Sequence, residues 1–325
     1  MLRRLLALIV AMVMIASIWL RSDVPQPSAL AGLTVVAIPL EQGCCQTGPL
    51  TLLGAWQLSS RHGAFGGYSA LLQNGAGRLL AISDRGYFLD FSEPGSGVRP
   101  PQFGAINQDS PQNKADRDFE AATRDPATGK LWLAQEGRNV IQRHGRGMAR
   151  EAFRAVPEMK GWSRNSGPEA MLRLADGRFL VVCECTGPGL LTDLHPGLIF
   201  GSDPALPGTA QQFSFAGVAG YRPTDMAQLP DGRILILARR LLWPLPPRFA
   251  MKVLVADPAE LRAGGTWHAR EVADIDAPWP VDNYEGLAIE PMVDGTLIAW
   301  MISDENRAAT QRVLLLKVRI DPARL

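Results

Sequence analysis

The sequence predicts an all-β fold: a β-propeller of about five four-stranded blades, with the ring closed by an N-terminal strand that completes the last blade. Two observations carry this prediction. A short unit recurs along the chain, in which a turn-forming glycine precedes an apolar run of four residues and then polar or charged residues. Strand-like runs flank each turn, and no long stretch of helical periodicity competes with them.

The recurring glycines set the period of this repeat. They are Gly77, Gly129, Gly177, Gly232 and, in a looser copy, Gly295. Successive members lie 52, 48, 55 and 63 residues apart. Most lie in tight-turn sequences that contain aspartate or proline, and a second short run precedes each turn. Each unit therefore begins with a β-hairpin.

Two further strand-like segments follow most of the hairpins. They are Asn139–His144, Ala149–Val156, Gly197–Phe200, Gln211–Ala216, Met251–Ala256 and Trp267–Ile275. Four antiparallel strands in a unit of about 50 residues match one propeller blade. Trp132 and Trp300 lie inside strand runs, so we expect them in the blade cores.

The two ends of the chain predict how the ring closes. After the last hairpin, one strong strand, Val313–Ile320, remains before the sequence ends. The segment Gly54–Ser60 can supply the missing outer strand and hide both exposed edges. This count gives five blades, and a sixth blade built around Leu33–Leu40 is the alternative.

Residues 1–31 are expected to be a signal peptide or an N-terminal membrane anchor. Arg3 and Arg4 precede an uncharged apolar run over residues 5–20, which is short for a membrane-spanning helix of about 20 residues. A small-residue cleavage signal, Ala29-Leu30-Ala31, lies well beyond that run. Both alternatives stay open. In either case we expect residues 32–325 outside the cytoplasm, in the periplasm or the medium, with membrane contact only through an uncleaved N-terminal segment.

The four cysteines fit that location without fixing a disulfide. Cys44 and Cys45 are adjacent and poorly placed to bridge each other, whereas Cys183 and Cys185 would share one face of a strand. A bridge between the first pair and the second is one alternative. Neither pair has the C-x-x-C spacing typical of zinc sites.

Composition and motifs exclude several function classes. The formal net charge is +1, and aromatic residues do not alternate with basic runs, so nothing favours nucleic acid. The sequence has no G-x-S-x-G elbow, P-loop, H-E-x-x-H or EF-hand loop. The four histidines lie outside the repeat. We expect no organic cofactor, and the oligomeric state stays open.

Acidic residues recur at the ends of the hairpin strands. The start of a hairpin's first strand lies beside the end of its second, which predicts five neighbouring pairs. These are Ser69 with Asp84, Glu120 with Glu136, Glu169 with Glu184, Asp225 with Arg239, and Glu285 with Asp304. If the first strands line the channel, the pairs converge on one mouth of the ring.

Carboxylates that lie so close together need a neutralising partner. Calcium takes six to eight oxygen ligands, and arginines such as Arg85, Arg117 and Arg222 could also serve. The candidate metal ligands are Asp84, Glu120, Glu136, Glu169, Glu184, Glu285 and Asp304. The alternative is that each carboxylate accepts backbone N–H groups of the next blade and only locks the ring.

Two segments are longer than simple connections. Glu93–Lys114 and the proline-rich Leu241–Arg248 both follow residues expected at the mouth. They could cover the mouth as lids or form surface loops without a role.

Three motifs resemble those of the phytase-like family, described as "esterase-like activity of phytase". They are Asp116–Ala121, Gly167–Met171 and Asn283–Ala288, and Ser83–Gly86 fits the same pattern. The resemblance spans Gly54 to Ile320. It implies an exported bacterial propeller associated with ester or phosphate-ester hydrolysis. The first unit departs from the acidic pattern at Ser69 and the fourth at Arg239.

The resemblance and the acidic mouth together suggest a calcium-assisted hydrolase of phosphate or carboxylic esters. Its catalytic candidates are Glu120, Glu169 and Glu285, and its substrate-binding candidates are Arg85, Arg117, Arg222 and Arg239. One alternative is a non-catalytic cell-envelope propeller that binds a small ligand or a protein. Another is a lactonase-type hydrolase, with Asn165 or Asn283 among the metal ligands.

Overall fold

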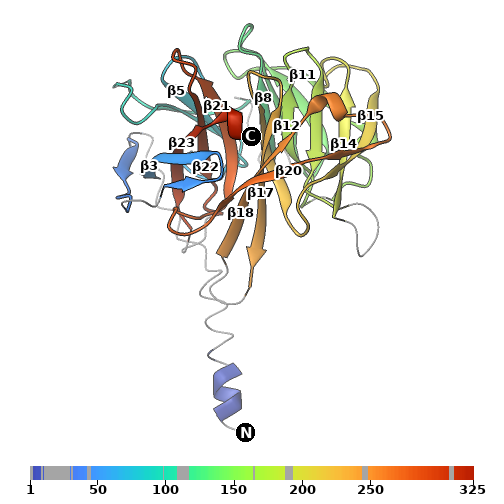
Figure 1. Cartoon of the computed structure of the whole chain (residues 1–325). Coiled ribbons are helices and arrows are strands. Elements are labelled where there is room, and N and C mark those ends of the chain that lie inside the picture. The colour runs from blue at the N-terminus through green and yellow to red at the C-terminus, as the bar shows by residue number, and fades with distance from the viewer. Residues whose placement is uncertain are drawn as a thin grey trace.

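The computed structural model describes residues 3–8, 10, 30, 32–41, 45–97, 99–107, 117–163, 165–186, 193–243, 248–306 and 311–325. Within these residues the chain forms five mainly antiparallel sheets arranged around a ring (Figure 1). The predicted all-β propeller of five blades is therefore confirmed.

The first two blades are four-stranded and follow the chain from the inner strand to the outer one. Blade 1 contains β4 (Tyr68–Gln73), β5 (Arg78–Ser83), β6 (Tyr87–Ser92) and β7 (Gln102–Ala105). Blade 2 contains β8 (Phe119–Arg124), β9 (Leu131–Gln135), β10 (Val140–His144) and β11 (Arg150–Ala155).

Blades 3 and 4 share the segment between Thr266 and Ile275. Blade 3 contains β12 (Pro168–Arg173), β13 (Phe179–Cys183), β14 (Leu194–Phe200), β15 (Ala210–Ala216) and the short β19 (Thr266–His268). Blade 4 contains β16 (Arg222–Gln228), β17 (Ile234–Leu242), β18 (Arg248–Ala256) and β20 (Arg270–Ile275). The run expected as one strand is split, because β19 pairs in parallel with β15 while β20 pairs with β18.

Blade 5 joins the two ends of the chain. It contains β21 (Tyr284–Pro291), β22 (Leu297–Ser303), β23 (Val313–Ile320), β3 (Leu50–Ser59) and β1 (Thr34–Ala37), and β2 (Gln46–Thr47) also pairs with β3. The β23–β3 ladder is antiparallel and runs from Val313 opposite Leu58 to Ile320 opposite Leu50. Ring closure by an N-terminal strand is thus confirmed. The six-blade alternative is wrong, because the Leu33–Leu40 segment adds β1 to the outer side of β3.

The inner strands contact one another in the order β4, β8, β12, β16, β21 and back to β4. Five apolar clusters fill the five blade interfaces. In β13, Phe179 and Val181 pack toward blade 2, and Leu180 and Val182 pack toward blade 4. A middle strand covered on both faces needs apolar residues at every position, which explains the continuous apolar runs of the repeat. Trp300 and Trp132 lie in two of these clusters, as expected.

Parts of the two long segments belong to the sheets where they are described. Gln102–Ala105, inside the expected excursion over residues 93–114, forms the outer strand β7 rather than a lid. Residues 108–116 and 244–247 lie outside the described part of the chain. Leu241 and Leu242 extend β17 past the mouth and pair with Phe249 and Arg248.

At the N-terminus, residues 3–8 are helical. Among the described residues, no helix has the length and apolar character needed to cross a membrane. Ala29, Ala31 and residues 11–20 lie outside the described part. A cleaved signal and a retained anchor therefore both stay predictions.

Candidate functional site

Every blade has a β-bulge near the start of its inner strand. The bulged residues, which have no partner in the register, are Ser69, Glu120, Glu169, Thr224 and Glu285. A bulge re-aims the extra side chain, so the same backbone device brings one side chain per blade to the channel. In blade 4 this residue is Thr224. The expected equivalence of Asp225 with the three glutamates is therefore wrong by one position.

In blades 1, 2, 3 and 5 the second strand of the hairpin ends beside this bulge, as predicted, whereas β17 of blade 4 continues past Arg239 to Leu242. The backbone N–H groups of Asp84, Glu136, Glu184 and Asp304 donate to the carbonyls of Gly67, Asp118, Gly167 and Asn283, respectively. In each case the acceptor lies two residues before the bulged one. The contact places Glu136 beside Glu120, Glu184 beside Glu169, and Asp304 beside Glu285.

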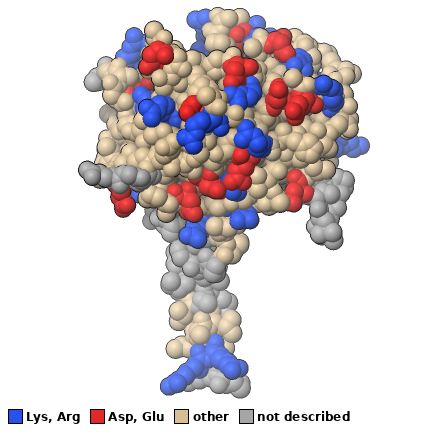
Figure 2. All heavy atoms as spheres, in the orientation of Figure 1, with Lys and Arg blue, Asp and Glu red and all other residues tan. Residues whose placement is uncertain are grey.

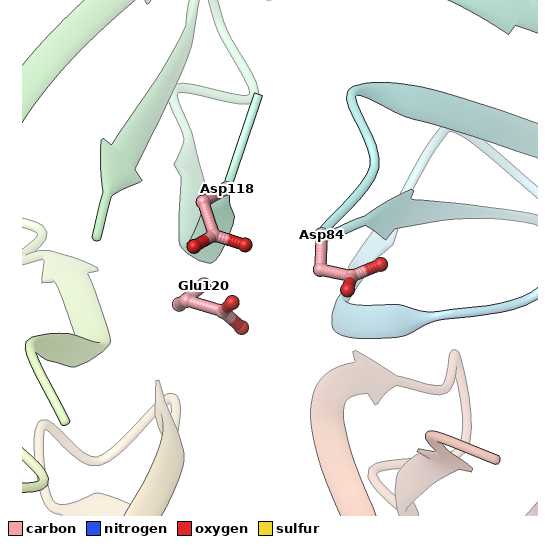
Figure 3. A group of neighbouring side chains, drawn as sticks. All are labelled: Asp84, Asp118 and Glu120. Atoms are coloured by element: carbon pink, nitrogen blue, oxygen red, sulfur yellow. The ribbon is translucent and has the colours of Figure 1, made fainter. Parts of the chain in front are cut away.

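Three carboxylates converge where blades 1 and 2 meet. Asp84 follows β5, Asp118 precedes β8, and Glu120 is the bulged residue of β8 (Figure 3). One carboxylate oxygen from each lies within 4.8 Å of the other two. Asp118 is buried, and the other two are partly exposed. Asp84 and Glu120 were expected as metal ligands, but Asp118 was not, although it lies in the Asp116–Ala121 motif.

A second cluster surrounds Arg239 on the blade 4 side of the mouth. Its guanidinium donates to Glu184 Oε1 at 2.9 Å, to Asn283 Oδ1 at 2.7 Å, and to Glu285 Oε1. Asn283 Nδ2 also donates to Glu285 Oε1 at 2.8 Å. Arg222 Nη1 lies 3.6 Å from Glu184 Oε2, and about half of its side chain is exposed. This half of the mouth is a compact ion-pair network.

The electrostatics of the two halves differ. The mouth shields Glu120 and Glu169 from bulk water, and this desolvation, together with nearby carboxylates, raises the pKa of both well above the usual value. The same causes raise the pKa of Asp304. Burial alone would lower the pKa of Arg239. The neighbouring carboxylates of Glu285 and Glu184 raise it by more than burial lowers it, so this arginine stays charged. The half near Glu120 therefore carries closely spaced acids, whereas Arg239 compensates the other half.

Three other acidic residues lock neighbouring blades, as the structural alternative predicted. Glu136 Oε1 accepts the Gly167 N–H at 2.7 Å, which joins blade 2 to blade 3. Asp225 Oδ2 accepts the Leu287 N–H at 2.7 Å, which joins blade 4 to blade 5. Glu305 Oε2 accepts the Gly67 N–H at 2.9 Å, which joins blade 5 to blade 1. Glu305 was not among the expected residues.

The hydroxyl groups at the two non-acidic bulges also join neighbouring blades through hydrogen bonds. Ser69 Oγ donates to Phe119 O at 2.6 Å, and Thr224 Oγ1 donates to Tyr284 O at 3.1 Å. Each accepting carbonyl precedes the bulged glutamate of the next blade. The hydroxyls thus fix the backbone from which Glu120 and Glu285 project.

The remaining arginine candidates lie near the triad. Arg85 Nη2 donates to the carbonyls of Phe65 and Gly66, and its Nε lies 3.9 Å from Asp84 Oδ1. The aliphatic part of the Arg117 side chain packs against Gly86. Acidic and basic groups are interspersed over the face shown in Figure 2, in keeping with the net charge of +1.

The cysteine pairing differs from the expected alternative. Cys183 and Cys185 form a disulfide with each other, and Cys45 is partly exposed. In an extended strand the two side chains would point the same way without meeting. Strand β13 ends at Cys183, so the chain leaves the extended conformation before Cys185 and the two sulfur atoms can bond. A bridge from Cys45 to Cys183 or Cys185 is therefore wrong. Cys44 lies outside the described residues.

Solved structures with a similar fold have low sequence identity. Glutaminyl cyclase from Myxococcus xanthus is 14% identical with a TM-score of 0.46, covering 84% of this chain and 97% of that one. A gluconolactonase from Xanthomonas campestris is 12% identical with a TM-score of 0.43, covering 87% and 97%. The WD40 domain of Neurospora crassa Pan2 is 11% identical with a TM-score of 0.42, covering 86% and 98%. Similarity at this level does not indicate a shared activity.

The comparison with curated protein sequences finds no match. A family model described as "Phytase-like: Esterase-like activity of phytase" matches residues 63–307. The matched range includes every bulged residue, the carboxylate triad and the Arg239 cluster, and it agrees with the resemblance seen in the sequence motifs. The chain belongs to the phytase-like family.

Proposed function

We propose that the channel mouth binds a calcium ion at Asp84, Asp118 and Glu120, and that the protein hydrolyses phosphate esters or carboxylic esters there. The observation that carries the proposal is the convergence of three carboxylate oxygens within 4.8 Å of one another. Membership of a family described by esterase-like activity supports hydrolysis as the reaction class.

The donor set suits a hard cation. Calcium takes six to eight oxygen ligands, so three carboxylates leave positions for water and for a substrate oxygen. Bound there, the ion would polarise the phosphoryl or carbonyl oxygen of an ester and lower the pKa of coordinated water. The wider predicted ligand set fits less well, because Glu136 is engaged by a backbone N–H and Glu184 and Glu285 by Arg239.

Other residues of the mouth suit binding and proton transfer. Glu169 is buried and its pKa is raised, so it keeps its proton to a higher pH than an ordinary glutamate and can deliver it to a leaving-group oxygen. Arg222 is half exposed and can bind an anionic substrate group, with Arg85 and Arg117 near the triad as further candidates. Arg239 is saturated by its partners. We therefore assign it to holding Glu184 and Glu285 in place rather than to substrate binding.

Calorimetric titration of chelator-treated protein with calcium tests the metal site directly. We expect one site in the wild type, and a loss of affinity of at least tenfold in Asp118→Asn. The matched control is Glu271→Gln, a change on β20, the outer strand of blade 4, that removes a charge from an ion pair with Lys252. Absence of calcium binding in the wild type would contradict the metal-assisted mechanism.

A second candidate function is a non-catalytic propeller that binds a ligand or a protein. It is favoured by the number of mouth carboxylates with structural roles, namely Glu136, Asp225 and Glu305. Hydrolysis of p-nitrophenyl phosphate and p-nitrophenyl acetate, measured with calcium and with chelator, separates the two functions. Calcium binding without any calcium-dependent rate would favour the binding function.

The lactonase alternative has less support. Asn283 is at the mouth, but both ends of its side-chain amide already bind Arg239 and Glu285. Asn165 is exposed in the loop before β12.

We also propose that the propeller works outside the cytoplasm. The Cys183–Cys185 disulfide suits an oxidising compartment, in keeping with the expected signal or anchor. Cell fractionation of the full-length chain, with antibody detection, would test this location.

A further inference from the structure

The Cys183–Cys185 disulfide encloses one residue, and that residue is Glu184 of the channel mouth. Glu184 is buried and accepts hydrogen bonds from Arg239 at 2.9 Å and 3.3 Å. His195 Nδ1 lies 3.1 Å from the carbonyl of Glu184 and 3.0 Å from that of Cys185. The small disulfide ring is thus built into the backbone that carries a mouth carboxylate.

This disulfide is poorly suited to stapling the fold. The stabilisation that a disulfide gives by restricting the unfolded chain grows with the length of the loop it closes, and here the cysteines are two residues apart. It joins no two strands, because Cys183 is the last residue of β13 and Cys185 lies in the bend that follows. What it does constrain is the conformation of the chain at Glu184.

We propose that Cys183 and Cys185 form a thiol–disulfide exchange site for an external dithiol, and that its redox state sets how firmly Glu184 is held against Arg239. This inference does not depend on the proposed hydrolysis or on calcium binding. It assigns a chemical role to two cysteines that the carboxylate site does not use.

The exposure of the two cysteines indicates the direction of exchange. Cys185 is partly exposed, whereas Cys183 is fully buried. A thiolate of the dithiol attacks Cys185 Sγ, the S–S bond breaks, and Cys183 leaves as a thiolate that takes up a proton. The second thiol of the reagent then attacks the mixed disulfide and releases Cys185 as a thiol, while the reagent leaves as a disulfide. Two electrons and two protons pass from the dithiol to the protein.

The surroundings of Cys183 suit the reduced form. The Cys185 backbone N–H lies 3.3 Å from Cys183 Sγ, where it can stabilise the departing thiolate. The carbonyl of Ser166 lies 3.2 Å from the same sulfur, in place to accept a hydrogen bond from the protonated thiol. Ser166 belongs to the loop that leads to Glu169, so opening the disulfide affects the approach to a second mouth carboxylate.

Opening under native conditions is tested with dithiothreitol on the folded full chain. Thiols are trapped with iodoacetamide and the peptide containing both cysteines is weighed. We expect both cysteines to be alkylated after reduction while the far-UV and near-UV circular dichroism stay native. Protein kept without reductant provides the control, because its disulfide should leave both cysteines unalkylated. Alkylation of Cys183 and Cys185 only when the protein unfolds would overturn the proposal.

Coupling to Glu184 is tested by melting temperature. We expect reduction to lower the melting temperature of the wild type by about 3 °C or more, and to leave that of Glu184→Gln nearly unchanged. Glu271→Gln should keep the full wild-type shift. A Cys183→Ser/Cys185→Ser variant should match the reduced wild type and ignore the dithiol. An equal shift in wild type and Glu184→Gln would show that the cysteines do not act through this carboxylate.

Discussion

Gly67 lies directly against the carboxylate of Asp84. Its φ is +67°, a conformation that side chains rarely adopt, and a Cβ at this position would overlap Asp84 Oδ1. The Gly67 N–H also donates to Glu305 of blade 5. A glycine is therefore needed here for both conformation and space, and it lets Asp84 approach the backbone on the blade 1 side of the triad.

Substituting this glycine should displace Asp84 from the candidate cation site. We expect Gly67→Ala to weaken calcium binding by about tenfold or more, about 1.4 kcal/mol, because one of three carboxylates is pushed away. The matched control is Gly75→Ala, which has a φ of +91° but open space around the added methyl group. The control shares the backbone strain without the overlap. Equal calcium affinities for both variants in calorimetry would remove Asp84 from the ligand set.

Arg239 pairs with two buried carboxylates on the blade 4 side of the mouth, so its removal should be costly. Arg239→Gln leaves the buried Glu285 without its charged partner and Glu184 with only the more distant Arg222, and we expect a loss of about 3–5 kcal/mol in the free energy of unfolding. Adding Glu285→Gln should restore part of this loss, because it removes one of the two stranded charges. Urea unfolding provides the measurement.

The control for this experiment is a surface pair of the same residue types. Arg178→Gln breaks an exposed ion pair with Asp176 and should change stability by less than about 1 kcal/mol. If Arg239→Gln were equally mild, the network would not be holding the mouth together.

The fold could be predicted because the propeller repeats its signal. Each blade needs a hairpin with a glycine turn and a middle strand covered on both faces, so five weak patterns at one spacing reinforce one another. The closing strand could be predicted because the last blade lacked an outer strand and an unpaired strand preceded the first hairpin. The split at Ala269 could not be predicted, because it depends on β15 of blade 3 offering a free edge to β19.

The site was predictable only to within a residue. In blade 4 the bulge falls on Thr224, and a shift of one residue turns Asp225 from the channel to the Leu287 N–H of blade 5. Bulge positions depend on how strands pack, which a single hairpin sequence does not state. Asp118 and Glu305 were missed for a related reason: they lie outside the strands, where the repeat gives no register.

The mouth carboxylates should make the stability of the metal-free protein depend on pH. Burial and mutual repulsion raise the pKa of Glu120, Glu169 and Asp304 in the folded state. Between the ordinary carboxyl pKa and these raised values, the folded protein binds more protons than the unfolded chain. Stability contributed by these groups is therefore greatest at low pH and is lost as the pH rises through that window.

The two buried histidines act in the opposite sense and must be separated. Burial lowers the pKa of His144 to about 4 and also lowers that of His195. The stability that these two neutral histidines contribute to the protein is therefore lost as the pH falls below about 6.5.

Comparing wild type with Asp304→Asn cancels the histidine contribution. With chelator present, we expect urea unfolding between pH 5 and 8 to show a smaller fall in stability with rising pH in Asp304→Asn than in wild type. Asp176→Asn, which alters an exposed carboxyl whose pKa is lowered mainly by its hydrogen bond with Arg178, should keep the wild-type slope over that range. Identical slopes for Asp304→Asn and wild type would mean that Asp304 stays ionised in the folded protein. A cation that chelator does not remove would then be needed to neutralise its charge.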